Sequence, residues 1–342
     1  MNNNLKKNKT FIIAEIGVNH NNNLNLAKKL IIEAKKSGAD AVKFQTFSAK
    51  RLVIPGTRKV KYQKQGFNDK ETHFQMIEKL ELSYNNHRKL FNFCKQKKIK
   101  FLSTPYDVES AKFLNKLGLK IFKTASADLT DFDLQTYLAK TKKTVIISTG
   151  MSTISEIEKT LKIYKKYKNN KYILLHCVSN YPCKHSSINL KAINLLKENF
   201  NCPVGYSDHS KDNLSASLSI ALEAKVIEKH FTLNKKMKGP DHKASCNPIE
   251  LKNYINDIRL SEEILGKKIK KLQKEEEEMS KISKKSLYFK ENFLKKRILK
   301  PEDLVAMRPA IGISPMEKKK IVGRKLKKNV KKNHLVNLKF LK

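Results

Sequence analysis

Eight short apolar segments alternate with segments of helical hydrophobic spacing, and this alternation limits the fold of the chain more than any other feature. The strand-like segments are 11–16, 41–47, 100–103, 120–125, 145–148, 172–178, 203–206 and 225–231. The helix-like segments between them are 24–37, 86–98, 108–117, 131–140, 153–168, 188–199 and 211–223. Strands that alternate with helices pair in parallel, so the sequence predicts an α/β fold, and eight repeats favour a closed (β/α)8 TIM barrel. An open doubly wound sheet is the alternative, although no glycine-rich dinucleotide loop follows the first strand.

The chain is expected to divide into three parts. Residues 1–266 form the barrel domain and end in a helix from about Pro248 to Leu265. Residues 267–285 are dense in Lys and Glu and form a solvated linker. Residues 286–342 consist of short apolar pieces between turns, which predicts a small β-rich domain. The segment 47–85 is too long for a simple crossover, so we expect an insertion over the barrel mouth.

Composition excludes several classes of protein. The net charge of +40 is the difference between 72 basic and 32 acidic residues, and only seven of the basic residues are Arg. Arg is the residue that most often binds a base or a phosphate through two parallel hydrogen bonds. We therefore expect a solvated basic surface that draws in an anionic substrate, and no nucleic-acid partner. No apolar run approaches the roughly 20 residues of a membrane helix, and the N-terminus lacks a secretory apolar region. The five cysteines show no C-x-x-C spacing, which favours a cytoplasmic location.

Polar side chains gather where the predicted strands end, at the mouth that carries the active site in such barrels. Alternate residues of a strand share a face, so Glu228 and His230 point the same way, as do Ser207 and His209 if that strand runs far enough. Barrel closure places Glu15 of the first strand beside them. Two imidazoles near carboxylates predict a divalent metal site, for Mn²⁺, Mg²⁺ or Zn²⁺. The alternative is that one histidine is a hydrogen-bonded core residue.

Two further groups at the mouth indicate an anionic ligand. Lys43 and Lys123 are cations at strand ends, and hydroxyl donors accompany them. The hydroxyls belong to Thr104, Ser126, Ser148 and Ser207. Together these groups suit a small phosphorylated or carboxylated molecule. The alternative for any single hydroxyl is an ordinary loop cap.

Nine short motifs carry a more specific resemblance. They are Ala14–His20, Val42–Thr46, Phe101–Pro105, Ser148–Met151, Leu175–Cys177, Tyr181–Pro182, Tyr206–His209, Glu228–Phe231 and Gly239–Asp241. In this order they resemble the signature set of the sialic acid synthases. The tail, with Arg308-Pro309 and Gly312, resembles that family's antifreeze-like (SAF) domain. The resemblance covers nearly the whole chain.

The resemblance implies a function. Family members condense phosphoenolpyruvate with an N-acetylated hexose to give a nonulosonic acid and phosphate, with a divalent metal, usually Mn²⁺, while Mg²⁺ or Co²⁺ are alternatives. It implies that His209 and His230 hold the metal and that Glu15 lies near the reacting carbons. The residues at positions that hold phosphoenolpyruvate are Lys43, Thr104, Lys123, Ser126, Ser148 and Ser207. The residues on the sugar side are Gln45, Tyr181 and Asp241.

The resemblance also implies a domain-swapped homodimer in which Arg308 reaches the partner's site. Two departures from the family pattern bear on the sugar: Asp128 stands where N-acetylneuraminate makers often have Glu, and Ser179 where some members have Asn near the phosphate. The acceptor is thus N-acetylmannosamine or a 2,4-diacetamido-trideoxyhexose, with the pseudaminate precursor less favoured. The segment 61–64 is closer to the legionaminate branch.

Two other functions compete with this one. Another phosphoenolpyruvate-dependent aldol synthase, such as the enzyme that opens the aromatic pathway, would use similar chemistry, but it does not explain the tail domain or the Gly239–Asp241 loop. A basic, non-catalytic anion-binding protein would explain the charge, but it leaves the set of polar residues at the strand ends unexplained.

Overall fold

The first of two compact units contains a closed barrel. The computed structural model describes residues 9–59 and 71–342, and the chain divides into Met1–Gly266 and Lys267–Lys342. In the first unit eight parallel strands pair in the order β3-β2-β1-β8-β7-β6-β5-β4, and β3 and β4 also lie against each other. The strands are β1 (Phe11–Gly17), β2 (Ala41–Thr46), β3 (Lys100–Pro105), β4 (Ile121–Thr124), β5 (Thr144–Ser148), β6 (Tyr172–Cys177), β7 (Val204–Asp208) and β8 (Val226–His230). The predicted (β/α)8 barrel is confirmed, and the open sheet is excluded.

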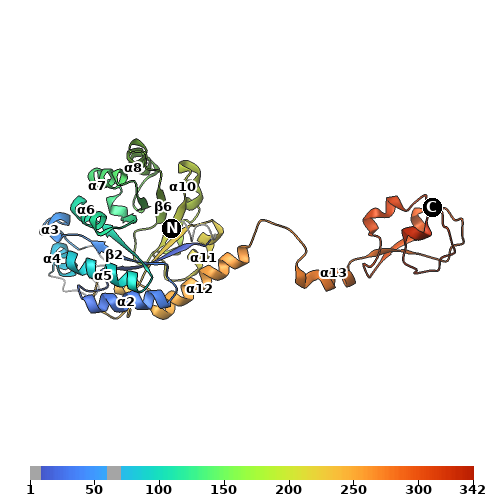
Figure 1. Ribbon diagram of the computed structural model, residues 1–342, viewed down its shortest axis with the longest axis horizontal. Coiled ribbons are helices and arrows are strands. Elements are labelled where there is room, and N and C mark those ends of the chain that lie inside the picture. Colours follow the sequence, from blue (N-terminus) through green and yellow to red (C-terminus); the bar gives the residue numbers. More distant parts are fainter. Residues whose placement is uncertain (1–8, 60–70) are drawn as a thin grey trace. The chain divides into compact units, whose positions relative to one another are not determined.

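Helices surround this barrel (Figure 1). They are α2 (Leu24–Lys36), α5 (Tyr84–Gln96), α6 (Val108–Leu117), α7 (Phe132–Lys140), α8 (Ile154–Lys166), α9 (His185–Ile188), α10 (Ala192–Phe200), α11 (Leu214–Ala221) and α12 (Pro248–Leu265). Several begin at a polar residue whose side chain accepts a hydrogen bond from a free backbone N–H of the first turn, as Asn23, Ser83, Asp107 and Thr153 do. These caps fix where each strand-to-helix loop ends.

Each strand has two faces with different partners. The helix-facing side chains, such as Val42 and Ile227, join the large core with the surrounding helices. The lumen holds a separate apolar layer of Phe11, Ile13, Ala41, Leu102, Ile121, Ile146, Ile173, Leu175 and Val226. Two residues further along the strands, the same lumen face becomes polar, at Glu15, Lys43, Lys123, Ser148 and Glu228. The apolar layer therefore forms the base on which the polar residues of the mouth stand.

Two short helices occupy the long segment after β2. They are α3 (Ala49–Leu52) and α4 (His73–Leu80). Phe47, Met76 and Leu80 pack with Val18, and Tyr106 packs against this cluster. The predicted insertion is thus present at the barrel mouth. Residues 61–64, in which the sequence is closer to the legionaminate branch, lie outside the described residues.

The second unit is small and contains little regular structure. It has α13 (Glu277–Ser283), an antiparallel pair of β9 (Ser286–Phe289) with β10 (Leu304–Met307), and 3-10 turns at Lys274–Glu276, Pro301–Asp303, Pro315–Lys320 and Leu338–Phe340. Isolated bridges, such as Phe293 with Val330, add further pairing. Leu287, Phe289, Leu304 and other apolar side chains make its own core.

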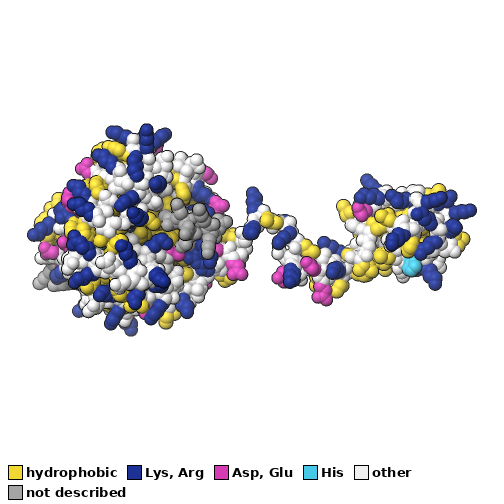
Figure 2. All heavy atoms as spheres, viewed as in Figure 1, with side chains coloured by type: hydrophobic (Ala, Val, Ile, Leu, Met, Phe, Trp, Pro, Cys, Tyr) yellow, Lys and Arg dark blue, Asp and Glu magenta, His cyan; other side chains and the backbone are white. Residues whose placement is uncertain are grey.

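The net charge of +40 is carried by basic side chains that do not gather in one patch on the face shown in Figure 2. On the face that Figure 2 shows, Lys and Arg side chains are dispersed among apolar and neutral groups. This dispersal supports the predicted solvated surface. Among the helices of residues 9–59 and 71–342, none combines the length and apolar character needed to cross a bilayer.

Candidate active site at the barrel mouth

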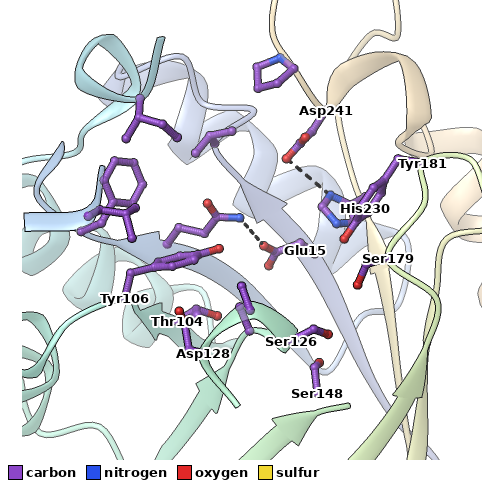
Figure 3. A pocket seen from close by; sticks show the side chains of 18 of the residues that line it. Glu15, Thr104, Tyr106, Ser126, Asp128, Ser148, Ser179, Tyr181, His230 and Asp241 are labelled. Carbon is purple, nitrogen blue, oxygen red and sulfur yellow. Dashed lines mark hydrogen bonds and ion pairs between the residues drawn. The ribbon is translucent and has the colours of Figure 1, made fainter. Parts of the chain in front are cut away.

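A pocket of about 770 Å³ opens at the C-terminal ends of the barrel strands. Of the residues predicted from sequence, it is lined by Glu15, Lys43, Gln45, Thr104, Lys123, Ser126, Asp128, Ser148, Ser179, Tyr181, Ser207, His209, His230 and Asp241. Arg308 is the exception, because it belongs to the second unit, where its Nε donates to the Ser283 carbonyl at 2.8 Å. Side chains from all eight strand ends thus share one cavity. Figure 3 shows several of them, among them Glu15, Thr104 and His230.

Two lysines and two carboxylates form the floor of the pocket. Lys43 Nζ lies 2.8 Å from Glu15 Oε2 and 3.6 Å from Glu228 Oε1. Lys123 Nζ is 3.9 Å from Glu228 Oε2. Register pairs Glu15 with Lys43 across β1 and β2, and Glu15 with His230 across β1 and β8. The predicted closeness of Glu15 to the eighth strand follows from this pairing.

Burial controls the charges of the floor. It raises the pKa of Glu15 to about 7; Lys43 opposes this shift and Glu228 reinforces it. Burial also works against the cation of Lys43, but Glu15 and Glu228 outweigh it and raise that pKa. The pKa of Glu228 is lowered, because Lys123 and Lys43 outweigh its burial. Glu15 is therefore the floor carboxylate that can exchange a proton near neutral pH.

Hydroxyl groups complete the side of the floor near β4 and β5. Lys123 Nζ donates to Ser148 Oγ at 2.5 Å, and the Gly150 N–H donates to Ser126 Oγ at 3.0 Å. A Cβ at Gly150 would lie 2.5 Å from Ser179 Oγ and 2.8 Å from Ser126 Oγ. A side chain at this position would therefore displace these hydroxyls, whereas the glycine lets its N–H hold Ser126 Oγ in place.

His209 and His230 lie side by side, with ring centroids 5.6 Å apart. The His209 Nδ1–H donates to the Val178 carbonyl at 2.7 Å, so in the neutral ring the lone pair is on Nε2. His230 Nδ1 is buried without a hydrogen bond in the described part of the chain, and it lies 3.8 Å from Asp241 Oδ2. Burial lowers the pKa of His209 to about 4 and that of His230 well below its usual value. Both rings are therefore neutral at physiological pH.

These features fit a partial set of metal ligands. Neutral imidazoles are common metal ligands, and His209 Nε2 faces the Ser207 hydroxyl at 3.4 Å. The Val178 carbonyl fixes the His209 ring as outer partners of ligating histidines do. Within residues 9–59 and 71–342, no three His, Cys, Asp or Glu side chains are arranged to hold a metal ion. A metal held by these two imidazoles would need further ligands.

Four further polar side chains line the pocket. Burial raises the pKa of Asp128 to about 7, and its Oδ2 has no hydrogen bond from the residues that the structure describes. Burial also raises the pKa of Asp241 to about 6, with Lys43 opposing the shift. Gln45 Nε2 donates to Glu15 Oε1 at 3.2 Å, and the Tyr181 ring stacks 4.1 Å from that of His209. An acidic hydroxyl of Asp128 can thus donate to a ligand.

Three features of the pocket were not predicted from sequence. Glu228 lies between the two lysines of the floor. Its spacing from His230 predicts that it faces the lumen, but not that it contacts these lysines. The ring of Tyr106 extends across the cavity, and its hydroxyl points toward Glu15 (Figure 3). An apolar wall from the segment after β2 faces this ring; it comprises Phe47, Leu52, Val53, Ile54, Met76, Ile77 and Leu80. Sequence indicates the insertion but not which of its side chains turn inward.

Comparison with known proteins agrees with this geometry. The chain is 45% identical over 330 residues to the N,N'-diacetyllegionaminic acid synthase of Campylobacter jejuni, covering 96% of this chain and 99% of that protein. It is 42% identical to the synthase of the same name from Legionella pneumophila, covering 94% of this chain and 91% of that protein. The crystal structure of the N-acetylneuraminic acid synthetase of Leptospira borgpetersenii, in complex with citrate, matches with a TM-score of 0.70 and 35% identity, covering 79% and 90% of the two chains. The NeuB family model matches residues 30–270, and the chain therefore belongs to the NeuB family.

Proposed function

We propose that this protein condenses phosphoenolpyruvate with an N-acetylated hexose to give a nonulosonic acid and inorganic phosphate. One observation carries the proposal: the two lysines and the hydroxyls of the floor share a single pocket with the paired imidazoles of His209 and His230. The floor suits a small dianionic substrate, and the imidazoles adjoin it. The family membership and the names of the relatives support the same reaction.

The cationic and acidic residues of the floor have different roles in this reaction. Lys43, Lys123 and the hydroxyls bind the phosphate and carboxylate of phosphoenolpyruvate and orient its C3 carbon toward the sugar aldehyde. C3 bonds to the aldehyde carbon, and the aldehyde oxygen takes up a proton to become a hydroxyl. Water adds at C2 and loses its protons, and the C2–O bond to phosphate breaks as C2 becomes a carbonyl. Glu15 accepts the proton of the water, since its raised pKa lets it take up and return a proton near neutral pH.

A divalent metal fits beside this floor. His209 and His230 would hold it, and we propose Mn²⁺ as the ion, with Mg²⁺ or Co²⁺ as alternatives. When bound, the metal supplies Lewis acidity to the aldehyde oxygen and orients the substrates.

The acceptor end of the pocket favours a sugar with several methyl groups. The apolar wall after β2 offers contacts for acetamido methyls and a 6-deoxy carbon, while Asp128 and Tyr106 supply polar contacts. We therefore propose a 2,4-diacetamido-trideoxyhexose as the acceptor, in preference to N-acetylmannosamine. The relatives named diacetyllegionaminic acid synthases support this choice.

The second unit completes the proposal. We infer that residues 286–342 are an antifreeze-like SAF domain after a linker at 267–285, and that Arg308 serves the partner's site in a domain-swapped homodimer. The exposed Arg308 side chain is available for such a contact. The five cysteines, all unpaired, support a cytoplasmic setting.

The proposed reaction is tested with purified protein, phosphoenolpyruvate, Mn²⁺ and a panel of N-acetylated hexoses. We expect phosphate release that depends on the sugar, and a product whose mass equals that of the two substrates plus water minus phosphate. No sugar-dependent phosphate release with any member of the panel would contradict the proposed reaction.

Removal of either imidazole should abolish metal binding. We expect His209→Ala and His230→Ala to lose both turnover and the binding of Mn²⁺, followed by electron paramagnetic resonance of the free ion, while keeping the circular dichroism of the wild type. His176→Ala is the matched control, because its ring lies against Tyr206 and bonds the Ile188 carbonyl away from the pocket. Wild-type turnover after thorough chelation would refute the metal site.

Mixing two inactive chains tests the role of Arg308. If the side chain serves the partner's site, Arg308→Ala and Glu15→Ala chains are each impaired, but their heterodimer has one site with neither change. We expect turnover to reappear in verified heterodimers, measured as phosphate release after co-expression and tag-based purification. Arg324→Ala is the control for loss of a charge in the same unit. Heterodimers as inactive as the parents would show that Arg308 does not act across the dimer.

Lengthening Asp128 should change the choice of acceptor. Asp128→Glu moves the carboxyl group outward by one methylene. We expect the ratio of kcat/KM for the two sugars to shift toward N-acetylmannosamine by about 1–3 kcal/mol, the value of one hydrogen bond to a polar partner.

Tyr106→Phe should raise KM for the acceptor and leave KM for phosphoenolpyruvate unchanged.

Tyr164→Phe is the control for these acceptor variants, because its hydroxyl bonds Gln135 outside the pocket. A sugar preference unaffected by Asp128→Glu would show that this side chain does not contact the acceptor.

A further inference from the structure

A buried ion pair lies directly behind the two histidines, on the helix-facing side of the barrel. Asp208 of β7 and Lys229 of β8 are register partners, and each is almost fully buried, with 1% and 2% exposure. Lys229 Nζ lies 3.0 Å from Asp208 Oδ2. The pair therefore joins the two strand ends through their side chains as well as their backbones.

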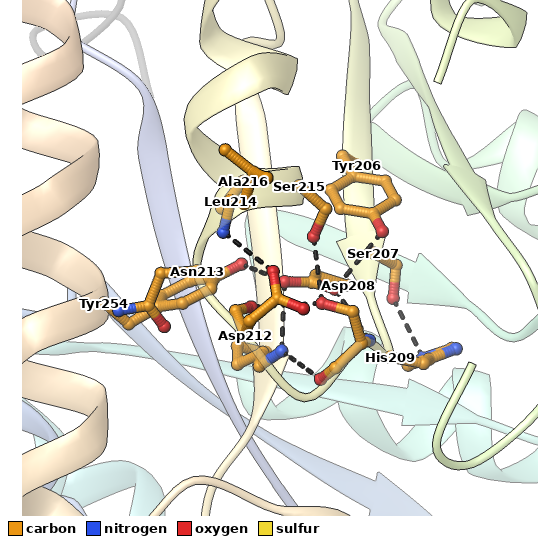
Figure 4. A network of polar contacts seen from close by, with 12 residues as sticks. Tyr206, Ser207, Asp208, His209, Asp212, Asn213, Leu214, Ser215, Ala216 and Tyr254 are labelled. Carbon is orange, nitrogen blue, oxygen red and sulfur yellow. Dashed lines mark hydrogen bonds and ion pairs between the residues drawn. The ribbon is translucent and has the colours of Figure 1, made fainter. Parts of the chain in front are cut away.

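The carboxylate of Asp208 is fully occupied by donors (Figure 4). Its Oδ2 accepts from Lys229 Nζ and, at 2.8 Å, from the hydroxyl of Tyr254 on α12. Its Oδ1 accepts from the Ser210 N–H at 2.8 Å and from the Tyr206 hydroxyl at 3.2 Å. Lys229 Nζ also donates to the Ser210 carbonyl at 2.7 Å. These contacts join three backbone segments: the end of β7 with Ser210, the end of β8, and α12.

The alternation of side chains connects this network to the pocket. Asp208 immediately precedes His209 and Lys229 immediately precedes His230, and the histidines face the cavity while the pair faces the helices. Ser210 immediately follows His209, so the backbone on both sides of that histidine is held by the pair. The pair and the two imidazoles therefore share the same two strand ends.

Stability alone does not account for such a pair. Removal of two charges from water is expensive, and well-packed apolar residues of similar volume are often as stable or more stable. Apolar contacts are not directional, so an apolar pair would not hold the two strand ends at particular donor and acceptor atoms.

We propose that Asp208 and Lys229, with Tyr254, are positioning residues that set the separation of His209 and His230. The inference rests on the proposed function in so far as that separation serves metal binding. It is independent of which sugar accepts the phosphoenolpyruvate carbon.

The test uses single and paired substitutions in the full chain. Asp208→Leu or Lys229→Met alone leaves a buried charge without its partner, so each should lower the melting temperature and weaken Mn²⁺ binding. The Asp208→Leu/Lys229→Met double variant should recover most of the melting temperature but bind Mn²⁺ more weakly than the wild type. The loss should not exceed the roughly 10- to 100-fold that follows removal of a group bonded directly to a ligand, because the pair acts on the histidines through the backbone. A purely structural pair would recover both together.

Two tyrosines supply a matched comparison. Tyr254→Phe removes one buried hydroxyl from the network, and Tyr164→Phe removes one from a hydrogen bond to Gln135 at the opposite side of the barrel. We expect similar losses of melting temperature, but weaker Mn²⁺ binding only for Tyr254→Phe.

A crystal structure of the double variant gives a readout that does not need the metal. We expect the separation of the two imidazole rings to depart from the 5.6 Å of the native chain. An unchanged separation, or native Mn²⁺ affinity in the double variant, would overturn the positioning role. A wild-type protein that binds no Mn²⁺ would refute the proposed metal site instead, and the ring separation would still decide the present inference.

Discussion

The site depends on the mutual neutralisation of charges that are almost fully buried. Lys43 keeps its proton inside the barrel because Glu15 and Glu228 lie within 4 Å of its ammonium group, at 2.8 and 3.6 Å. The same contacts hold Glu228 ionised and leave Glu15 as the carboxyl that exchanges a proton near neutral pH. The arrangement requires three neighbouring strands, β2, β1 and β8, to present these side chains at one level. Closure of the barrel is what brings the first and last strands together.

Much of this arrangement could be predicted because a strand alternates strictly. The spacing of Glu228 and His230 puts them on one face, and the structure places both in the pocket together with His209. The parallel register adds that Glu15 lies opposite His230. The shared face of Glu228 and His230 follows from strand geometry alone. The position of Glu15 beside them also requires a closed barrel, which the eight strand–helix repeats predict.

The remainder depends on contacts that no local pattern encodes. The sequence signals the insertion after β2 by its length, but the inward turn of Met76 and Leu80 follows from packing against Val18 and Phe47. The ring of Tyr106 crosses the cavity because it packs on this cluster. The ion pair of Asp208 and Lys229 likewise needs the register of β7 with β8, since 20 residues separate the two in sequence.

The apolar layer inside the lumen has a consequence for the passage of molecules. Phe11, Ile146 and Leu175, with the rest of that layer, close the barrel beneath the lysines, so the pocket opens only toward the strand ends in the part of the chain that the structure describes. Both substrates enter and both products leave through this mouth. A second molecule that binds beside the apolar wall lies between the floor and this mouth. Under the proposed reaction, phosphoenolpyruvate on the floor therefore lies deeper in the pocket than a sugar beside the apolar wall.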